Sequence, residues 1–521
     1  MWRRHRVFLA FGISLLAASV VFAVGETSRR FDFFDNAGGL NDKGSPVSID
    51  DDEAADLQNV VFETDGAIRK RDGESKFNTR TLTNNPAGTG LFYFRQTDGD
   101  DWLVKTTTNA KVFTATNVAG LYQEITGAAT WTGSQNVLSS FDAASNVLLL
   151  EDGDGTTPPW QWNPDDTIKQ VKALGGSPPD ATMLKYHKNH LFVAGDSSAP
   201  SQLSFSNLGA IELWDAGDKI NVETNDGSPI TALWVQLDGL YIGKRSAIFR
   251  LDGTSRGDFQ LQRMVAGVGP VNHQSVAVLD NVAYFVAPTG HIYRYDGGIT
   301  TERVSDRITR TIDGLNLSRT QYAIAGLQDR SYWVAVTASG GSTHNRILLY
   351  DVPTDSWTKF KGINANAMAW AYDPNDQLQF YTAGYAGYTY LQRDTNADDG
   401  QAIAAYWASK WHRFAGVPVE KILRWVKLVP TVEGNWNLSL EVRTDFEATG
   451  TSRSINLSEG GSVWNTMVWN TDTWGGRQVF ISAQPIDKKG EFFQVRFANS
   501  NADEPFTVRG YSTDVDATGR P

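Results

Sequence analysis

The feature that most constrains the fold of this chain is a spacing that occurs seven times along its middle part. In each repeat a polar or Asn/Asp turn leads into an apolar strand, and successive strands begin 46, 43, 49, 44, 49 and 47 residues apart. The strands begin near Trp102, Leu148, Leu191, Leu240, Tyr284, Trp333 and Phe380. A period of about 40 to 50 residues with several short strands per unit is typical of propeller blades. The sequence therefore predicts an all-β protein with a β-propeller of seven blades.

The internal order of the repeats supports this interpretation. Between His273 and Gly298, an alternating strand meets an Asp280-Asn281 turn, a second strand follows, and Thr289-Gly290 turns the chain into a third. A neighbouring repeat has the same order, with Asp238-Gly239 as its expected tight turn at positive φ. Short strands at regular spacing also occur in a large β-sandwich or in two smaller β domains, which remain the alternatives.

Two tryptophans of the repeats are expected in the core. Trp333 lies in the apolar strand of the sixth repeat. Trp357 belongs to a segment, Leu348 to Phe360, that resembles a kelch blade, and we expect it to pack between blades.

The periodicity stops near Asp394, where the polar sequence DTNADDGQ forms a connector. Several strands with alternating apolar residues follow it, which predicts a C-terminal β-sandwich or jelly-roll-like domain. The expected organisation is a signal-like apolar segment at 1–26, an extended arm and hairpin at 27–90, the propeller at 91–395 and the sandwich at 400–521.

Composition narrows the classes of function. The 521 residues include no cysteine, which excludes disulfides, thiol nucleophiles and cysteine metal sites. The formal net charge of -12 argues against protein-wide attraction to nucleic acid, and no sequence-specific nucleic-acid binding is predicted. The net charge does not exclude a local basic patch.

The first 26 residues have the pattern of a targeting segment. Arg3, Arg4 and Arg6 precede an apolar run from Val7 to Ala23, which looks like a secretory signal peptide. An uncleaved anchor with a membrane contact and a mis-set start are the two alternatives.

The segment from Phe31 to Gly73 does not follow the pattern of the repeats. Its glycines and the Ser45-Pro46 pair predict an extended arm, and Ile49 to Asn59 is expected to form one or two helical turns. A hairpin around Asp65-Gly66 follows, and its second strand carries three basic residues. This triplet either touches phosphate or is a solvated strand end facing the acidic run. The candidate assembly residues are Gly38, Gly39, Leu40, Asn41, Ser45, Pro46, Arg69, Lys70 and Arg71.

Three passages, in order, resemble one family. They are GGLN followed by SP and LQNVVFETDGAIRKRDG, the stretch from Val265 to Ile308, and AAYWASKWHRFAGVPVEKILRWVKLVPTV followed by WNLSLEVRTD. Together they look like the β-propeller tail-hub proteins of short-tailed bacteriophages, often called packaged-DNA-stabilisation proteins. The resemblance spans most of the chain from Phe31 to about Asp445.

The resemblance implies a structural protein of the virion tail. Such a protein forms a homo-oligomeric ring, a hexamer in the family, below the portal and its adaptor, where it plugs or extends the DNA channel and carries needle or fibre proteins. The extended arm would then reach a neighbouring protein and order on it. The signal-like N-terminus departs from this pattern, because virions assemble in the host cytoplasm, so a periplasmic or secreted location is the alternative.

A search for catalytic chemistry finds little. His187 and His190 have no third ligand nearby, and the acidic segments at Glu151–Gly155 and Asp394–Gly400 lack the full spacing of a calcium loop. Phosphate-binding GxxxxGK[ST] and Asp-box patterns do not occur. The sequence therefore predicts no enzyme, no cofactor and no catalytic or metal site. A secreted propeller that binds a protein or glycan is the main alternative function, and an exported glycan hydrolase is less favoured.

Overall fold

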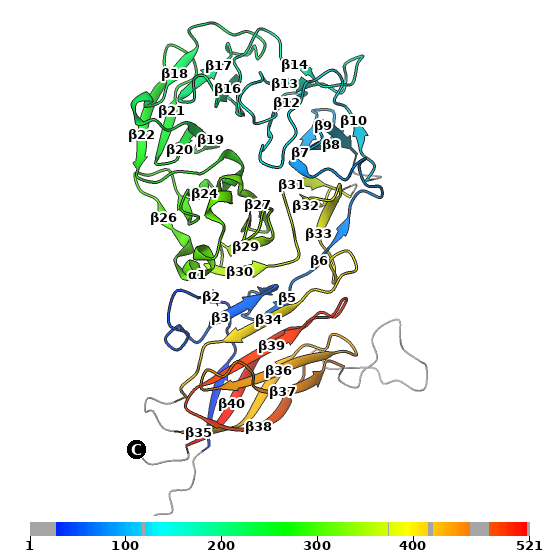
Figure 1. The fold of residues 1–521 in the computed structure, drawn as a ribbon, viewed down its shortest axis with the longest axis vertical. Helices are drawn as coiled ribbons and strands as arrows, with labels where there is room; N and C mark the ends of the chain where they lie inside the picture. The colour runs from blue at the N-terminus through cyan, green and yellow to red at the C-terminus, as the bar shows by residue number, and fades with distance from the viewer. Residues whose placement is uncertain (1–27, 117–119, 374, 415–419, 459–478, 518–521) are drawn as a thin grey trace, which may run out of the picture.

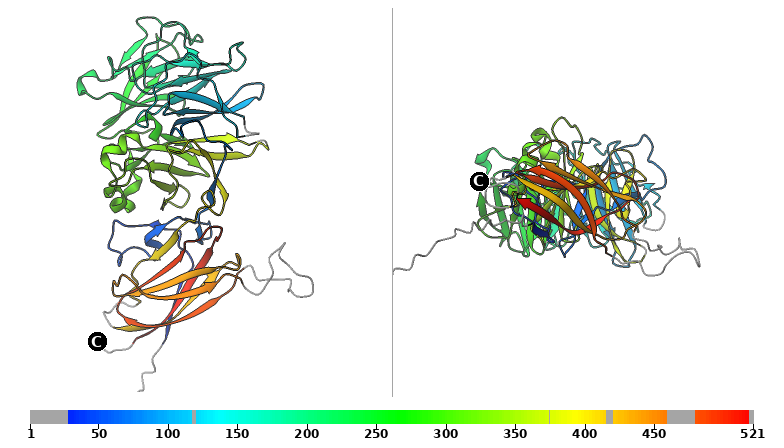
Figure 2. Two further views of the ribbon diagram at one scale, coloured as in Figure 1. Left: turned by 45° about the vertical axis from the view of Figure 1, so that its right-hand side comes forward. Right: turned by 90° about the horizontal axis from the view of Figure 1, so that it is seen from below.

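The structure is a computed structural model that describes residues 28–116, 120–373, 375–414, 420–458 and 479–517. Among these residues the chain is all-β, and the only α-helix is the five-residue α1 (Thr309–Asp313). The strands form many small four-stranded sheets in a propeller-like arrangement, above two larger sheets (Figures 1 and 2). No helix within the described ranges is long and apolar enough to cross a membrane.

Seven four-stranded antiparallel sheets follow one another around the propeller-like part. The first two consist of β7 (Gly88–Arg95), β8 (Asp101–Thr107), β9 (Lys111–Ala115) and β10 (Gln123–Glu124), and of β11 (Ser140–Ala144), β12 (Val147–Glu151), β13 (Trp160–Trp162) and β14 (Lys172–Ala173). The third and fourth consist of β15 (Met183–His187), β16 (His190–Ala194), β17 (Gln202–Phe205) and β18 (Lys219–Asn221), and of β19 (Ile230–Gln236), β20 (Gly239–Lys244), β21 (Ala247–Asp252) and β22 (Gln260–Ala266).

The remaining three sheets continue the same order. The fifth and sixth consist of β23 (Ala277–Leu279), β24 (Val282–Val286), β25 (Ile292–Tyr295) and β26 (Glu302–Arg303), and of β27 (Ile324–Gln328), β28 (Ser331–Val336), β29 (Arg346–Asp351) and β30 (Ser356–Phe360). The seventh consists of β31 (Ala367–Tyr372), β32 (Leu378–Ala383), β33 (Thr389–Thr395) and β6 (Gly73–Lys76). The 3-10 helices η1 (Thr224–Asp226), η2 (His273–Ser275), η3 (Val304–Ile308) and η4 (Leu317–Tyr322) lie in the links.

The ring of small sheets is closed by a strand from before the first sheet, which pairs into the last sheet. β6 precedes the first sheet in sequence, yet it pairs with β33 and completes the seventh, with Lys76 opposite Tyr390. β31 of the seventh sheet also contacts β7 of the first. The structure therefore differs from the expected propeller start at residue 91, because a strand at 73–76 supplies the edge that the last sheet lacks.

The repeat predicted from the sequence is confirmed at the level of strands. Each of the seven apolar segments is the second strand of a four-stranded sheet, where it is paired on both sides: β8, β12, β16, β20, β24, β28 and β32. Trp333 and Trp357 are 2% and 1% exposed, as expected for core residues.

The hairpin turns are confirmed with one correction. Asp280 and Asn281 both have positive φ, at 50° and 61°, as the sequence predicts. In the neighbouring repeat the positive-φ residues are Leu237 and Asp238, and Gly239 already belongs to β20. Gln236 pairs with Gly239, and this register places the two-residue loop one position earlier than expected.

Two six-stranded sheets form the second part of the molecule. One contains β38 (Ser482–Gly490), β35 (Lys421–Pro430), β40 (Thr507–Ala517), β5 (Ile68–Lys70) and β4 (Val60–Phe62), with β1 (Arg29–Phe33) paired to β40. The other contains β2 (Gly39–Leu40), β3 (Glu53–Gln58), β34 (Ala405–Ser409), β39 (Phe493–Asn499), β36 (Asn437–Thr444) and β37 (Thr451–Asn456). Both sheets contribute to one hydrophobic cluster, which includes Leu57, Trp407, Val426, Phe497 and Tyr511 and continues into the fifth and sixth small sheets.

The N-terminal segment is not a separate arm. β1 to β5 all pair within the two six-stranded sheets, which otherwise come from residues beyond 404. The expected separation of an arm at 27–90 from a sandwich at 400–521 is therefore wrong. β1 to β5 and the C-terminal strands form one unit, built from both ends of the chain. The helical turns expected at Ile49–Asn59 are also wrong, because β3 pairs with β34 and buries Ala54 and Leu57. Tertiary pairing here overrides the local preference.

Candidate functional site: the central channel

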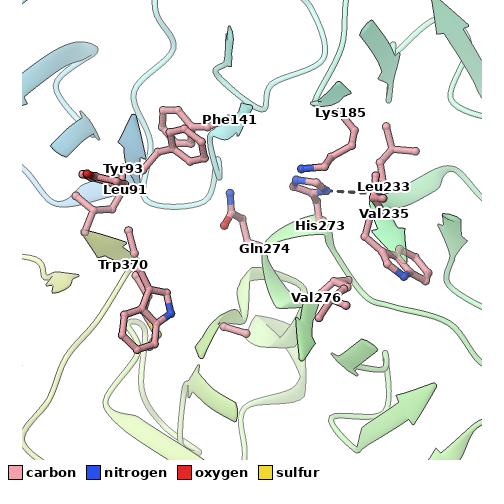
Figure 3. A pocket seen from close by; sticks show the side chains of 16 residues that line it. Leu91, Tyr93, Phe141, Lys185, Leu233, Val235, His273, Gln274, Val276 and Trp370 are labelled. Atoms are coloured by element: carbon pink, nitrogen blue, oxygen red, sulfur yellow. Dashed lines mark hydrogen bonds between the residues drawn. The ribbon is translucent and has the colours of Figure 1, made fainter. Parts of the chain in front are cut away.

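A cavity of about 550 Å³ lies at the centre of the seven small sheets (Figure 3). The first strand of each sheet, or the η2–β23 segment that begins the fifth, contributes to its wall. Most lining side chains are apolar or aromatic, and they include Tyr93, Phe141, Trp234, Met368 and Trp370. The innermost strands therefore enclose an apolar channel.

Three polar side chains interrupt this apolar wall: Lys185, His273 and Gln274 (Figure 3). Lys185 Nζ lies 2.9 Å from an Asp142 carboxylate oxygen, so a cation of the third sheet is paired with an anion of the second. This ion pair joins neighbouring sheets and leaves the wall without an unpaired charge at Lys185.

The short helix η2 crosses from the link between the fourth and fifth sheets toward the second sheet. The Leu233 amide donates a hydrogen bond to His273 Nδ1 at 3.3 Å, and His273 Nε2 lies 3.3 Å from Ser140 Oγ. Gln274 Nε2 donates to the Ser139 carbonyl. Side chains of η2 thus connect β19 with the start of β11.

These contacts lie between two neighbouring cavities. A second cavity of about 150 Å³ is lined by residues at the starts of the inner strands, among them Leu138, Thr182 and Thr231. It shares His273 and Gln274 with the larger cavity. The two side chains therefore lie where the two chambers meet, and we call them the plug.

The plug is electrically neutral. Burial, with a smaller effect from nearby Lys185, lowers the pKa of His273 to about 4. The imidazole is therefore uncharged at neutral pH. Because Nδ1 accepts the Leu233 amide proton, Nε2 carries the ring proton and donates it to Ser140 Oγ.

The other end of η2 is fixed to the sixth sheet. Asn272 caps η2 by accepting from the Ser275 amide at 2.7 Å, and its side-chain amide donates to the Ala323 carbonyl at 2.8 Å. Tyr332 OH donates to the Ser275 carbonyl at 2.6 Å. Anchored from the second, fourth and sixth sheets, η2 cannot swing out of the channel without breaking several hydrogen bonds.

Gly39, Leu40 and Asn41 of the predicted assembly residues contact other segments of the same chain. Gly39 has φ +74°, and a Cβ there would come within 2.8 Å of Ser356 and of the Trp357 backbone in β30. Leu40 is 1% exposed, and Asn41 Nδ2 donates to Glu53 Oε2 at 2.8 Å.

Neighbouring residues complete this contact. Gly38 approaches Asp52 and Glu53, the Ser45 carbonyl accepts from the Ser48 amide, and the Pro46 carbonyl accepts from the Trp411 amide at 2.7 Å. Both carboxylate oxygens of Asp42 accept amide hydrogen bonds from α1. The segment 38–46 therefore joins the propeller-like part to the two large sheets.

The basic triplet is neither a phosphate site nor a solvated strand end. Lys70 is buried, and its Nζ donates to Asn499 Oδ1 at 2.9 Å and to the Asn501 carbonyl at 2.7 Å. Burial lowers its pKa to about 8. Arg69 pairs with Asp72 at 2.6 Å.

Arg71 makes the strongest contact of the triplet. Its guanidinium binds Asp398 through two hydrogen bonds, at 2.8 Å and 2.5 Å, and Nε donates to Asn59 Oδ1 at 3.0 Å. Asp398 belongs to the polar connector predicted at the end of the repeats. This buried pair therefore ties the connector to the start of the chain.

The histidine pair and Glu151 of the acidic segment lie at the ends of strands in the propeller-like part. His187 and His190 face each other across a hairpin, and His190 Nδ1 lies 2.6 Å from the Ser206 carbonyl. Glu151 is buried without a hydrogen-bond partner for its carboxyl oxygens, and burial raises its pKa well above the usual value. Within the described ranges, no group of three His, Asp or Glu side chains is placed to hold a metal ion.

Sequence reasoning missed the plug. His273 and Gln274 stand at the start of the best-defined repeat, but no periodic signal separates a channel-facing residue from an ordinary strand lead. The only available sign was the position of two polar residues, HQ, directly before an apolar strand.

Comparison with known proteins adds little. No protein-family model matches the chain, and no curated protein matches it. Among solved structures, the AfRom2 CNH domain is similar with a TM-score of 0.39 and 9% identity, over 61% of this chain and 98% of that domain. A likeness this distant does not bear on the function of the chain.

Proposed function

We propose that this chain is a structural subunit of the tail of a short-tailed phage, a ring-forming hub below the portal and adaptor that stabilises packaged DNA and carries tail appendages. In this proposal the seven small sheets are the seven blades of a β-propeller, and the two six-stranded sheets are a β-sandwich. The shared channel of the inner strands and the shared core of the large sheets support these two assignments.

One observation carries the proposal: the three passages that resemble the hub family coincide with the parts that hold the molecule together. The first contains Gly39 and Arg71 of the joint, and Asp42 directly follows its GGLN. The second contains η2, which plugs the channel. The third forms β34 and β35, the centre of the large sheets. A propeller locked to a second module is a rigid building block, which is what a ring of identical subunits needs.

The plug separates the subunit's channel from any path for DNA. Two chambers of about 550 and 150 Å³ with His273 and Gln274 between them do not form a conduit for a duplex. In a hub, DNA would therefore pass along the axis of the ring of subunits. The net charge of -12 is compatible with such a passage, because an acidic protein surface does not bind the DNA phosphates tightly.

The deciding experiment is peptide mass spectrometry with N-terminal labelling on density-banded particles and on the periplasmic fraction of the same culture. We expect peptides of this chain in DNA-filled particles, in a fixed ratio to those of the portal protein, which serves as the internal control. Presence only in the periplasm would refute the hub.

The competing function is a secreted propeller that binds a protein or glycan. The basic residues and apolar run before Ala23 favour it, and they lie outside the described residues. This alternative predicts a first residue near Val24 and a monomer in sedimentation experiments, whereas the hub predicts a ring.

A further inference from the structure

A second large cavity, of about 600 Å³, lies between the sixth and seventh small sheets. Its wall comes from the β28–β29, β30–β31 and β32–β33 loops, from β6 and β33, and from the connector at 398–402. None of its lining residues lines the central channel. Its volume is within the usual range for small-molecule sites, about 300 to 1,000 Å³.

Glu74 is the buried ionisable group of this cavity, and Thr382 is a second buried polar residue of its wall. Glu74 is 7% exposed, and its Oε2 accepts one hydrogen bond, from Gln392 Nε2 at 2.5 Å. The described part of the chain offers this carboxyl no further hydrogen bond. Neither of its carboxyl oxygens is among the buried atoms that lack a partner, so Oε1 is open to the cavity that Glu74 lines and can accept a hydrogen bond from a ligand.

Two of the three carboxyl groups of the wall are paired with cations. Asp398 is held by Arg71 and Asp399 by Lys76, each at 2.5 Å. Burial, followed by the nearby Asp398 and Asp399 carboxylates, raises the pKa of Glu74 to about 7, against the opposing effect of its Gln392 hydrogen bond. An anionic ligand would meet carboxylates whose cations are already engaged, and a cationic ligand would find no free carboxylate pair. A neutral ligand fits this balance.

The remaining wall offers the groups that bind hydroxyls. Tyr385 OH accepts from the His344 amide at 3.0 Å and donates to Asn366 Oδ1 at 2.9 Å, so this ring is held in place. Tyr390 is half-buried and presents an aromatic surface, while Asn364 is exposed at the rim. Carboxyl and amide groups donate to and accept from hydroxyls, and an aromatic ring packs against the C–H face of a sugar.

We propose that this cavity binds a neutral sugar of one or two rings, with Glu74 hydrogen-bonding a ligand hydroxyl and Tyr390 packing against the ring. The site goes beyond the proposed hub function, since a hub subunit assembles without a small ligand. Its test is independent of where the protein is located in the cell or the particle.

The test is isothermal titration calorimetry of the full chain with glucose, galactose, N-acetylglucosamine, maltose and lactose, and with glucosamine and glucuronic acid as charged counterparts. We expect at least one neutral sugar to bind more tightly than its charged counterparts. The variant Asn364→Trp, which fills the mouth from an exposed position, should weaken this binding by about tenfold or more.

Two further variants locate the contact. Glu74→Gln keeps the shape of the side chain but removes the carboxyl, and it should weaken binding. Glu302→Gln makes the same chemical change on exposed β26, far from the cavity, and should bind like the parent chain. Melting curves of all variants report whether they fold.

Three results would overturn the proposal. The first is that no neutral sugar of the panel binds the parent chain. The second is that Asn364→Trp folds and binds as tightly as the parent chain. The third is that the charged sugars bind as well as the neutral ones. The hub function would stand or fall separately, by the presence of the chain in particles.

Discussion

Two buried tryptophans of the sixth small sheet differ in one hydrogen bond, and this difference makes a sharp prediction. Trp333 in β28 packs edge-on against Phe360 and Phe380, at centroid distances of 5.3 and 5.4 Å, and its indole nitrogen has no hydrogen-bond partner. Trp357 in β30 donates from its indole nitrogen to the Val304 carbonyl at 2.8 Å. We expect the two sites to respond differently to loss of the indole N–H.

The size of the effect follows from the burial. A buried aromatic side chain removes about 150 to 250 Å² from water, which is worth roughly 4 to 6 kcal/mol at about 25 cal/mol per Å². At Trp333 the unpaired N–H offsets about 1 to 3 kcal/mol of this, and the two ring pairs add about 1 to 3. These two effects cancel, and because alanine keeps part of the buried area, Trp333→Ala should lower the free energy of unfolding by about 3 to 5 kcal/mol.

Phenylalanine separates packing from hydrogen bonding. Trp333→Phe keeps most of the apolar contact and removes the unpaired N–H, so we expect a change within about 1 kcal/mol of the parent chain. Trp357→Phe leaves the Val304 carbonyl without its donor, and it should cost about 1 to 2 kcal/mol more than Trp333→Phe.

Urea denaturation followed by far-ultraviolet circular dichroism measures these differences, since tryptophan fluorescence would change with the substitutions themselves. Equal midpoints for the two phenylalanine variants would refute the hydrogen-bond assignment. An unchanged midpoint for Trp333→Ala would show that the register of β28 is wrong.

Three other perturbations test the joint and the plug. Arg71→Ala should lower the free energy of unfolding by about 3 to 5 kcal/mol, because it leaves Asp398 without its cation. Arg69 is partly exposed, so Arg69→Ala should lower it by at most about 1 kcal/mol. Thermal melting of both variants checks this difference. For His273, the folded pKa of about 4 lies below the unfolded value of about 6.5, so its contribution is present above pH 6.5 and is lost as the pH falls to 4, by roughly 3 kcal/mol. The variant His273→Gln should therefore show a flatter loss of stability with acid than the parent chain, and parallel acid curves would contradict the buried neutral imidazole. Deleting residues 31–48 should lower the melting temperature, because it removes β2 and most of β1 from the large sheets, and a normal calorimetric transition would mean that this segment does not pair as described.

The repeat was readable from the sequence because it is local. Each small sheet is a meander whose strands and turns follow one another, so alternation of apolar residues and Asn/Asp turns within about 45 residues carries most of the information. The same reasoning placed Trp333 and Trp357 in the core. It failed by one residue at Leu237-Asp238, where pairing register rather than residue preference sets the turn.

Only the tertiary structure decided the features that depend on residues far apart in the chain. β6 completes a sheet whose other strands lie some 300 residues later, and Arg71 finds Asp398 across 327 positions. The segment at 38–46 reads as an arm because its glycines and proline lack a local partner, and its partners lie in β30, α1 and β34–β35. The plug formed by η2 and the cavity around Glu74 are likewise invisible in a local pattern, because a buried polar side chain is defined by the groups that surround it. Short-range periodicity specifies strands and turns, whereas sheet edges, buried ion pairs and cavities are settled by which distant segments the fold brings together.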